Sequence, residues 1–194
     1  LVSFIPPADI RDLRELCRYR LKLTYTRTSE KNRYQNSMTI SKDRIDSVFT
    51  DPFGKSATDI MSYLVRTDPE NVSDDKILGF VRKGCKASSE EILDSIHGYE
   101  FLGVQRDKLQ IISIHLEDIN KCIAMIDQKL EYFRLKYSKV IQHLTTMVGI
   151  SVESALYILG EIGTDMSVWR DSASLSSWAG LSPANNASAR KNKS

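Results

Sequence analysis

The sequence has few cysteines and no long apolar run, and each scarcity excludes a class of protein. Its three cysteines are far apart and form no Cys-x-x-Cys pair, which argues against a disulfide framework and against a zinc site. No run of about 18 apolar residues occurs, so we expect no membrane span, and no signal peptide is recognisable. We therefore expect a cytoplasmic protein. Because the sequence opens on Leu1 and ends in a polar, basic stretch, we also expect a fragment.

The sequence also lacks a large net charge. The formal charge is +2, which by itself predicts no nucleic-acid partner. The distribution is uneven, however. Residues 1–34 hold eight Lys or Arg against four Asp or Glu, and the last five residues include Arg190, Lys191 and Lys193. Basic ends around a neutral middle suit contact with phosphates, although composition alone favours the simpler interpretation that both ends are solvated.

The alternating pattern of β-strands is almost absent, and we expect an all-α fold. The first helix is predicted from about Ala8 to about Tyr34. Its basic stripe contains Arg11, Arg14 and Arg18, on a different face from its apolar residues. The stripe is either a contact for a phosphate backbone or a solvated face, and the residues leave both interpretations open.

The strongest periodicity is an apolar series whose steps alternate between three and four residues, as in a heptad seam. Its members are Leu109, Ile112, Leu116, Ile119, Ile123, Ile126, Leu130, Phe133, Tyr137, Val140 and Leu144. We expect one continuous helix on the order of 55–60 Å long. Its seam must pack against another helix, in the same chain or in a partner. Of these two arrangements, we favour a coiled coil between subunits.

A short helix follows a turn that contains Gly149. Ser151 is predicted to cap this helix, which starts at Val152, and Gly160 and Gly163 are expected to end it. Helix, glycine turn and helix outline a helix-hairpin-helix unit, in which backbone N–H groups bind a DNA phosphate. The usual hairpin carries a second glycine where this sequence has Ser151.

The stretch from Leu144 to Ser194 resembles the C-terminal domain of insertion-sequence-110 transposases (the IS116/IS110/IS902 type). Its blocks Glu161-Ile162-Gly163 and Ala179-Gly180-Leu181-Ser182-Pro183 have the order and spacing of that family. The opening block at 12–33 is similar to the basic helix that follows the family's catalytic domain. The resemblance extends over about the whole chain and is loose over 40–100.

The resemblance implies a DNA transposase with two half-sites. A RuvC-like domain holds a divalent metal such as Mg²⁺ on acidic residues, which would precede Leu1, so no metal ligand and no cofactor is assigned here. A serine of the C-terminal domain is the nucleophile, and the matching position is Ser188. Arg190 and Lys191 can neutralise the phosphate that this hydroxyl attacks. The partners implied are DNA and a guide RNA.

We therefore divide the chain into a basic helix (1–38), a small helical subdomain (39–98), a coiled-coil helix (99–143) and the start of the serine-bearing domain (144–194). The residues expected to contact DNA are Gly149, Ser151, Arg190, Lys191, Lys193, Arg11, Arg14 and Arg18. The parent is expected to carry out DNA transposition as a homo-oligomer, and this piece is expected to be inactive alone. Two alternatives stay open: a non-catalytic DNA-binding module and a purely structural coiled-coil protein.

Overall fold

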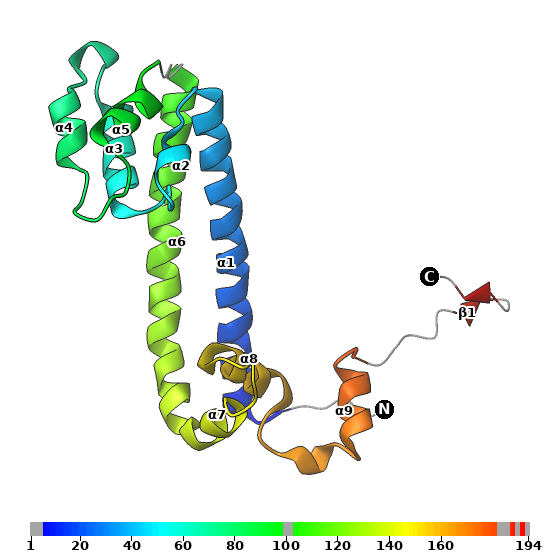
Figure 1. Cartoon of the computed structure of the whole chain (residues 1–194). Coiled ribbons are helices and arrows are strands. Elements are labelled where there is room, and N and C mark those ends of the chain that lie inside the picture. Colours follow the sequence, from blue (N-terminus) through cyan, green and yellow to red (C-terminus); the bar gives the residue numbers. More distant parts are fainter. Residues whose placement is uncertain (1–5, 99–102, 182–186, 189–190, 193–194) are drawn as a thin grey trace. The chain divides into compact units, whose positions relative to one another are not determined.

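The computed structural model describes residues 6–98, 103–181, 187–188 and 191–192, and it confirms the all-α class (Figure 1). Two helices are long, α1 (Ala8–Ile40) and α6 (Gly103–Lys136). The shorter helices are α2 (Ile45–Val48), α3 (Lys55–Arg66), α4 (Asp74–Gly79), α5 (Ser89–Ile96), α7 (Ser138–Leu144), α8 (Val152–Ile162) and α9 (Ser172–Trp178), with 3-10 turns η1 (Pro69–Asn71) and η2 (Met166–Val168). Strands β1 (Ala187–Ser188) and β2 (Lys191–Asn192) form a two-residue antiparallel pair.

The chain forms two compact units. The first, called here the contiguous unit, is Tyr19–Gln128. The second, called here the discontinuous unit, combines the residues up to Arg18 with those from Lys129 onward. The first turns of α1 and the last turns of α6 therefore belong to the discontinuous unit, and the rest of both helices belongs to the contiguous unit.

The contiguous unit has a core where α3 and α5 meet the end of α1 and the start of α6. Burial of aliphatic side chains at about 25 cal/mol per Å² is the main stabilising contribution to such a core. A capping box at Ser88 fixes the start of α5: the Ser88 hydroxyl accepts the Glu91 N–H, and the Glu91 carboxylate accepts the Ser88 N–H. The most deeply buried core residues are Met38, Ile45, Ile60, Met61, Leu64, Ile77, Ile92, Ile96 and Leu109.

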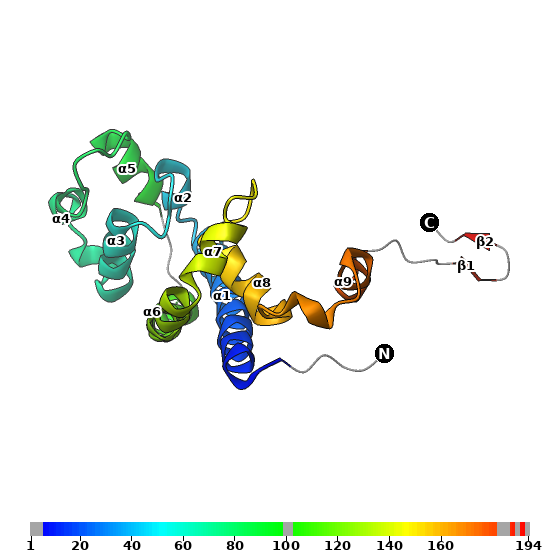
Figure 2. The same ribbon diagram turned by 90° about the horizontal axis from the view of Figure 1, so that it is seen from below.

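The heptad seam of α6 is buried within this one chain. Of its residues from Leu109 to Phe133, none is more than 9% exposed. In the contiguous unit α1 and α6 lie side by side, as Figures 1 and 2 show. Their direction is antiparallel, because Arg20 pairs with Asp127 at 2.6 Å whereas Glu30 lies 3.3 Å from His115. The seam is thus already covered, and it supplies no reason for pairing between subunits.

The expected continuous helix to Leu144 is wrong in one respect: it breaks at Tyr137. The 34 residues of α6 correspond to about 51 Å at about 1.5 Å per residue. Tyr137 has ψ 20°, and α7 begins after it. In the discontinuous unit the Tyr137 hydroxyl donates to the Asp9 carboxylate, to which Lys136 also donates at 2.7 Å. These two contacts lower the pKa of Asp9 to about 2, and they fix the backbone at the break.

No helix in the described part of the chain has both the length and the apolarity to cross a membrane. The first helix is longer than expected and continues beyond Tyr34 to Ile40, because Tyr34 and Met38 both enter the core of the contiguous unit.

Candidate functional site

The discontinuous unit contains the predicted pair of helices around a glycine turn. Helices α7 and α8 contact each other, and the turn between them includes a hydrogen bond from the Ile150 N–H to the Met147 carbonyl at 3.2 Å. Gly149 has φ +90°, a left-handed conformation that a residue with a Cβ adopts only at a cost. The glycine is therefore needed for the shape of this turn.

Ser151 has the capping role that its sequence position predicts. Its Oγ accepts the Ser154 N–H at 3.1 Å. The next residues, however, add a negative charge at the start of α8. Glu153 lies in the first turn and pairs with Arg134 at 3.5 Å. A carboxylate already occupies the positive end of this helix dipole, so a phosphate at Gly149 and Ser151 would meet its repulsion.

Helix α8 crosses the start of α1 at close range. Gly160 makes this possible, because a Cβ added there would lie 3.3 Å from the Arg14 Cα. Our expectation that Gly160 helps to end α8 is therefore wrong, since the helix continues to Ile162. Gly163, with φ +72°, ends it. The position of Gly160 against a neighbouring backbone, which the sequence does not show, explains the difference.

Two arginines of the predicted basic stripe bind the end of α8. Arg14 donates through Nε to the Gly160 carbonyl and through Nη2 to the Glu161 carbonyl, both at 2.9 Å. Arg18 binds the Glu161 carboxylate with two hydrogen bonds of 2.8 Å, which raise the Arg18 pKa above its usual value. A cation at the C-terminal carbonyls also stabilises the helix dipole.

Arg11, the third member of the stripe, differs from its neighbours. Its side chain is exposed and makes no hydrogen bond or ion pair with any residue that the structure describes. Arg11 is therefore available to a phosphate, whereas Arg14 and Arg18 would have to exchange Glu161 for one. Sequence analysis did not identify Glu161 as their partner, because a separation of more than 140 residues carries no local signal.

The candidate nucleophile lies in the short β-hairpin. Ser188 of β1 pairs in register with Lys191 of β2, so the backbone places these two predicted site residues opposite each other. Arg190 and Lys193 lie outside the described residues. Within the described ranges, no group of three or more His, Cys, Asp or Glu residues could hold a metal ion.

The helix before this hairpin is capped by an aspartate. Helix α9 begins after Asp171, which is its N-cap. The Asp171 carboxylate accepts the Ser174 N–H at 2.7 Å. An aspartate is as good a cap as a serine, and its contact with Ser174 lowers the Asp171 pKa.

These features define a helical protein in which a helical hairpin, held by an arginine pair, precedes a short serine-bearing β-hairpin. The family model of transposases of the IS116/IS110/IS902 family matches residues 141–194. This match confirms the predicted resemblance for the segment that contains Glu161, Ser188 and Lys191. No curated protein and no solved structure matches the chain.

Proposed function

We propose that this chain is part of a DNA transposase that binds, cleaves and rejoins DNA strands when an insertion sequence moves. The observation that carries the proposal is the family match over residues 141–194. A second observation supports it: Glu161, from one block of the resemblance, binds Arg14 and Arg18 from the other. The two blocks therefore form one structural unit.

Ser188 is the proposed nucleophile. Its Oγ would attack a DNA phosphorus, so that an Oγ–P bond forms while a P–O bond of the DNA backbone breaks, and the departing DNA oxygen takes up the proton that the serine hydroxyl gives up. The attack requires that the phosphate charge be neutralised. Lys191, opposite Ser188 in the hairpin register, is the residue proposed for that role, together with Arg190.

The proposed DNA contacts fall into two groups. The first group is Arg11, whose side chain makes no hydrogen bond or ion pair with any described residue, together with Lys191 and Lys193 of the basic tail, which the sequence predicts as phosphate contacts. Arg14 and Arg18 join them only if the DNA displaces Glu161. A guide RNA and Mg²⁺ are proposed for the parent protein, in which the family's separate acidic domain holds the metal. We accordingly expect this chain alone to give no strand-transfer product.

Replacement of Ser188 in the full-length parent tests the nucleophile. Ser188→Ala is expected to reduce transposition to background while DNA binding, measured by gel shift, stays within about twofold, because a single hydroxyl contributes little to phosphate affinity. The matched control is Ser177→Ala, an exposed serine of α9, which should transpose normally. Normal transposition by the Ser188→Ala protein would exclude this residue as the nucleophile and favour the non-catalytic DNA-binding module.

A further inference from the structure

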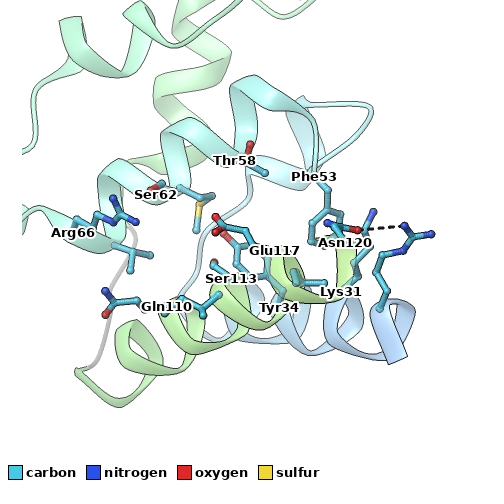
Figure 3. A pocket seen from close by; sticks show the side chains of 15 residues that line it. Lys31, Tyr34, Phe53, Thr58, Ser62, Arg66, Gln110, Ser113, Glu117 and Asn120 are labelled. Carbon is cyan, nitrogen blue, oxygen red and sulfur yellow. Dashed lines mark hydrogen bonds between the residues drawn. The ribbon is translucent and has the colours of Figure 1, made fainter. Parts of the chain in front are cut away.

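The contiguous unit contains a groove of about 370 Å³ between α1, α3 and α6 (Figure 3). A volume of this size is in the range of small-molecule sites. The groove lies outside the segment that the family model matches, and none of its residues belongs to the site proposed above. Its walls combine apolar, amide, hydroxyl and charged side chains, and this combination indicates which ligand would fit.

The charges in the groove are unbalanced. Arg27, Lys31 and Arg66 line it together with a single acid, Glu117. Arg66 makes no hydrogen bond or ion pair with any described residue. Arg27 donates only to a neutral amide, Asn120 Oδ1, at 3.3 Å. An excess of cations over acids in a partly enclosed site attracts an anionic ligand.

Lys31 is the cation nearest to an aromatic ring of the groove. Its Nζ lies 4.4 Å from the centroid of the Phe53 ring, and no carboxylate of the described residues pairs with it. Lys31 and Arg27 are four residues apart on α1 and therefore share a helix face. Together they form a positive end of the groove: Figure 3 shows Lys31 near Asn120, the residue to which Arg27 donates.

Glu117 adds a feature that an anion site does not need. Its carboxylate lies in the middle of the groove (Figure 3) and makes no hydrogen bond with any described residue. A carboxylate only accepts hydrogen bonds when ionised, and its two oxygens accept best from two adjacent N–H groups. The ligand should therefore be anionic at one end and carry N–H donors at some distance from that end.

The floor of the groove is largely apolar, and the two aromatic rings in it are inclined to each other by 52°. Tyr34 and Phe53 contact each other with ring centroids 5.6 Å apart, and Met61 and Val65 lie beside them. The Tyr34 hydroxyl bonds with Ser113, and burial raises the Tyr34 pKa to about 12, so this ring stays neutral. Such a floor suits a weakly polar aromatic ring, which can pack against one of the two rings.

We propose that the groove binds one nucleotide, with its phosphate at Arg27 and Lys31 and its base on the apolar floor against Glu117. Guanine is the preferred base, because its ring N–H and adjacent amino group offer two neighbouring donors to the carboxylate. Uracil offers one N–H between two carbonyl oxygens, which the carboxylate repels. The nucleotide can be free or an unstacked unit of a single strand, since both present the same groups.

Binding of mononucleotides to the full chain, measured by isothermal titration calorimetry, tests the proposal. Guanosine monophosphate is expected to bind at least about tenfold more tightly than either guanosine or uridine monophosphate, because guanosine lacks the phosphate and uracil cannot offer two neighbouring N–H donors to Glu117. Failure of guanosine monophosphate to bind, or equal affinity for all three compounds, would overturn the proposal. Short uridine strands with and without one central guanosine show whether the bound nucleotide is free or part of a strand. If the guanosine-containing strand binds more tightly than guanosine monophosphate, the ligand is a nucleotide within a strand. If the two bind equally, the ligand is a free nucleotide.

Two variants assign the contacts. Lys31→Met keeps an apolar side chain on Phe53 but removes the charge, so it should reduce affinity for guanosine monophosphate part of the way towards that for guanosine, because Arg27 still contacts the phosphate. Lys22→Met, at an exposed lysine of the same helix, is the control and should bind normally. Glu117→Gln should remove the preference for guanine over uracil. If both groove variants bound like the unchanged chain, the site would be elsewhere. None of these measurements involves Ser188, so they fail or succeed independently of the transposase proposal.

Discussion

Glu161 and its neighbour Gly160 bind two arginines of α1 through three different groups. The Glu161 carboxylate binds Arg18 with two hydrogen bonds, and the Glu161 and Gly160 carbonyls bind Arg14. The two arginines differ in exposure: the side chain of Arg14 is 17% exposed and that of Arg18 is 55% exposed. Charged hydrogen bonds contribute more where water is excluded, so Arg14 should contribute more to stability than its neighbours on the stripe.

Replacement of single arginines in the stripe checks this difference. Arg14→Ala should lower the free energy of unfolding by about 2 kcal/mol, since it leaves two helix carbonyls without a charged donor. Arg11→Ala, at an exposed and unpaired position, should change it by less than about 0.5 kcal/mol. Urea denaturation followed by circular dichroism measures both values. Equal effects would contradict the capping role of Arg14.

Asp43 makes the contiguous unit sensitive to pH. This carboxyl is 2% exposed, and its Oδ2 has no partner among the described residues, while Oδ1 accepts the Ile45 N–H at 2.9 Å. Burial, with a smaller contribution from Asp46, raises the Asp43 pKa from 3.8 to about 6. A pKa that is higher in the folded state means that stability from this group is complete below about pH 4 and is lost as the pH rises through about 6.

Asp43→Asn should remove the loss of folding stability that occurs as the pH rises through about 6. The amide oxygen can still accept the Ile45 N–H, but no charge needs to be buried at neutral pH. We expect a gain of about 2 kcal/mol at about pH 7.5 and a flatter stability profile between about pH 4 and 6. Thermal or urea unfolding at several pH values measures both the gain in stability and the shape of the profile. The exposed Asp46→Asn is the control and should leave most of the pH dependence in place, and an unchanged profile for Asp43→Asn would assign that dependence to another group.

Helix α6 has a second apolar face besides its buried seam. Ile111, Ile114 and Met125 are each more than half exposed. They share a three–four spacing with Asp118 and Lys121, which pair with each other at 3.0 Å. The homo-oligomer expected from the sequence would need a face of this kind, because the first seam is already occupied by the chain itself.

An antiparallel pair of α6 helices from two copies would bring these residues into register. With the two-fold axis between Asp118 and Lys121, Ile114 meets the partner's Met125, and Asp118 meets the partner's Lys121. We expect a dimer by sedimentation equilibrium. Asp118→Lys should weaken it by about tenfold, because it places like charges opposite each other.

The charge-exchanged double variant is the control for this dimer. Asp118→Lys with Lys121→Asp restores opposite charges across the axis, so it should dimerise like the unchanged chain. Ile114→Glu should give monomers with an unchanged circular dichroism spectrum. If the chain sediments as a monomer throughout, or if the single charge variant dimerises normally, this face does not mediate self-association.

The spacing of apolar residues predicts helices well where those residues are the ones that become buried. The seam from Leu109 to Phe133 is buried as its spacing indicates. The break at Tyr137 was missed because the same spacing continues through Val140, whereas the break depends on a contact with the distant Asp9. Gly160 was misread for a related reason: a glycine that ends a helix and a glycine that admits a second backbone look the same in sequence.

At the scale of the whole molecule, the proposed DNA binding should depend on salt. If Arg11 and the cations of the tail neutralise about three phosphates, the logarithm of the binding constant should fall with a slope of about −3 against the logarithm of salt concentration. Arg11→Ala should reduce that slope by about one, and Lys83→Ala, an exposed lysine of the contiguous unit, should not. Gel shifts at several salt concentrations measure the slope for the unchanged chain and for each variant. A binding constant that is independent of salt would favour a structural coiled-coil protein.

The two segments of the discontinuous unit are synthesised at different times. Its first segment, ending at Arg18, is synthesised early, but the partner segment begins only at Lys129. Arg14 and Arg18 therefore have no Glu161 to bind until the intervening residues have been synthesised. The contiguous unit can fold during that delay, and its folding shortens the effective loop that must close. During translation, the basic stripe is thus unpaired and open to any polyanion until α8 has been made.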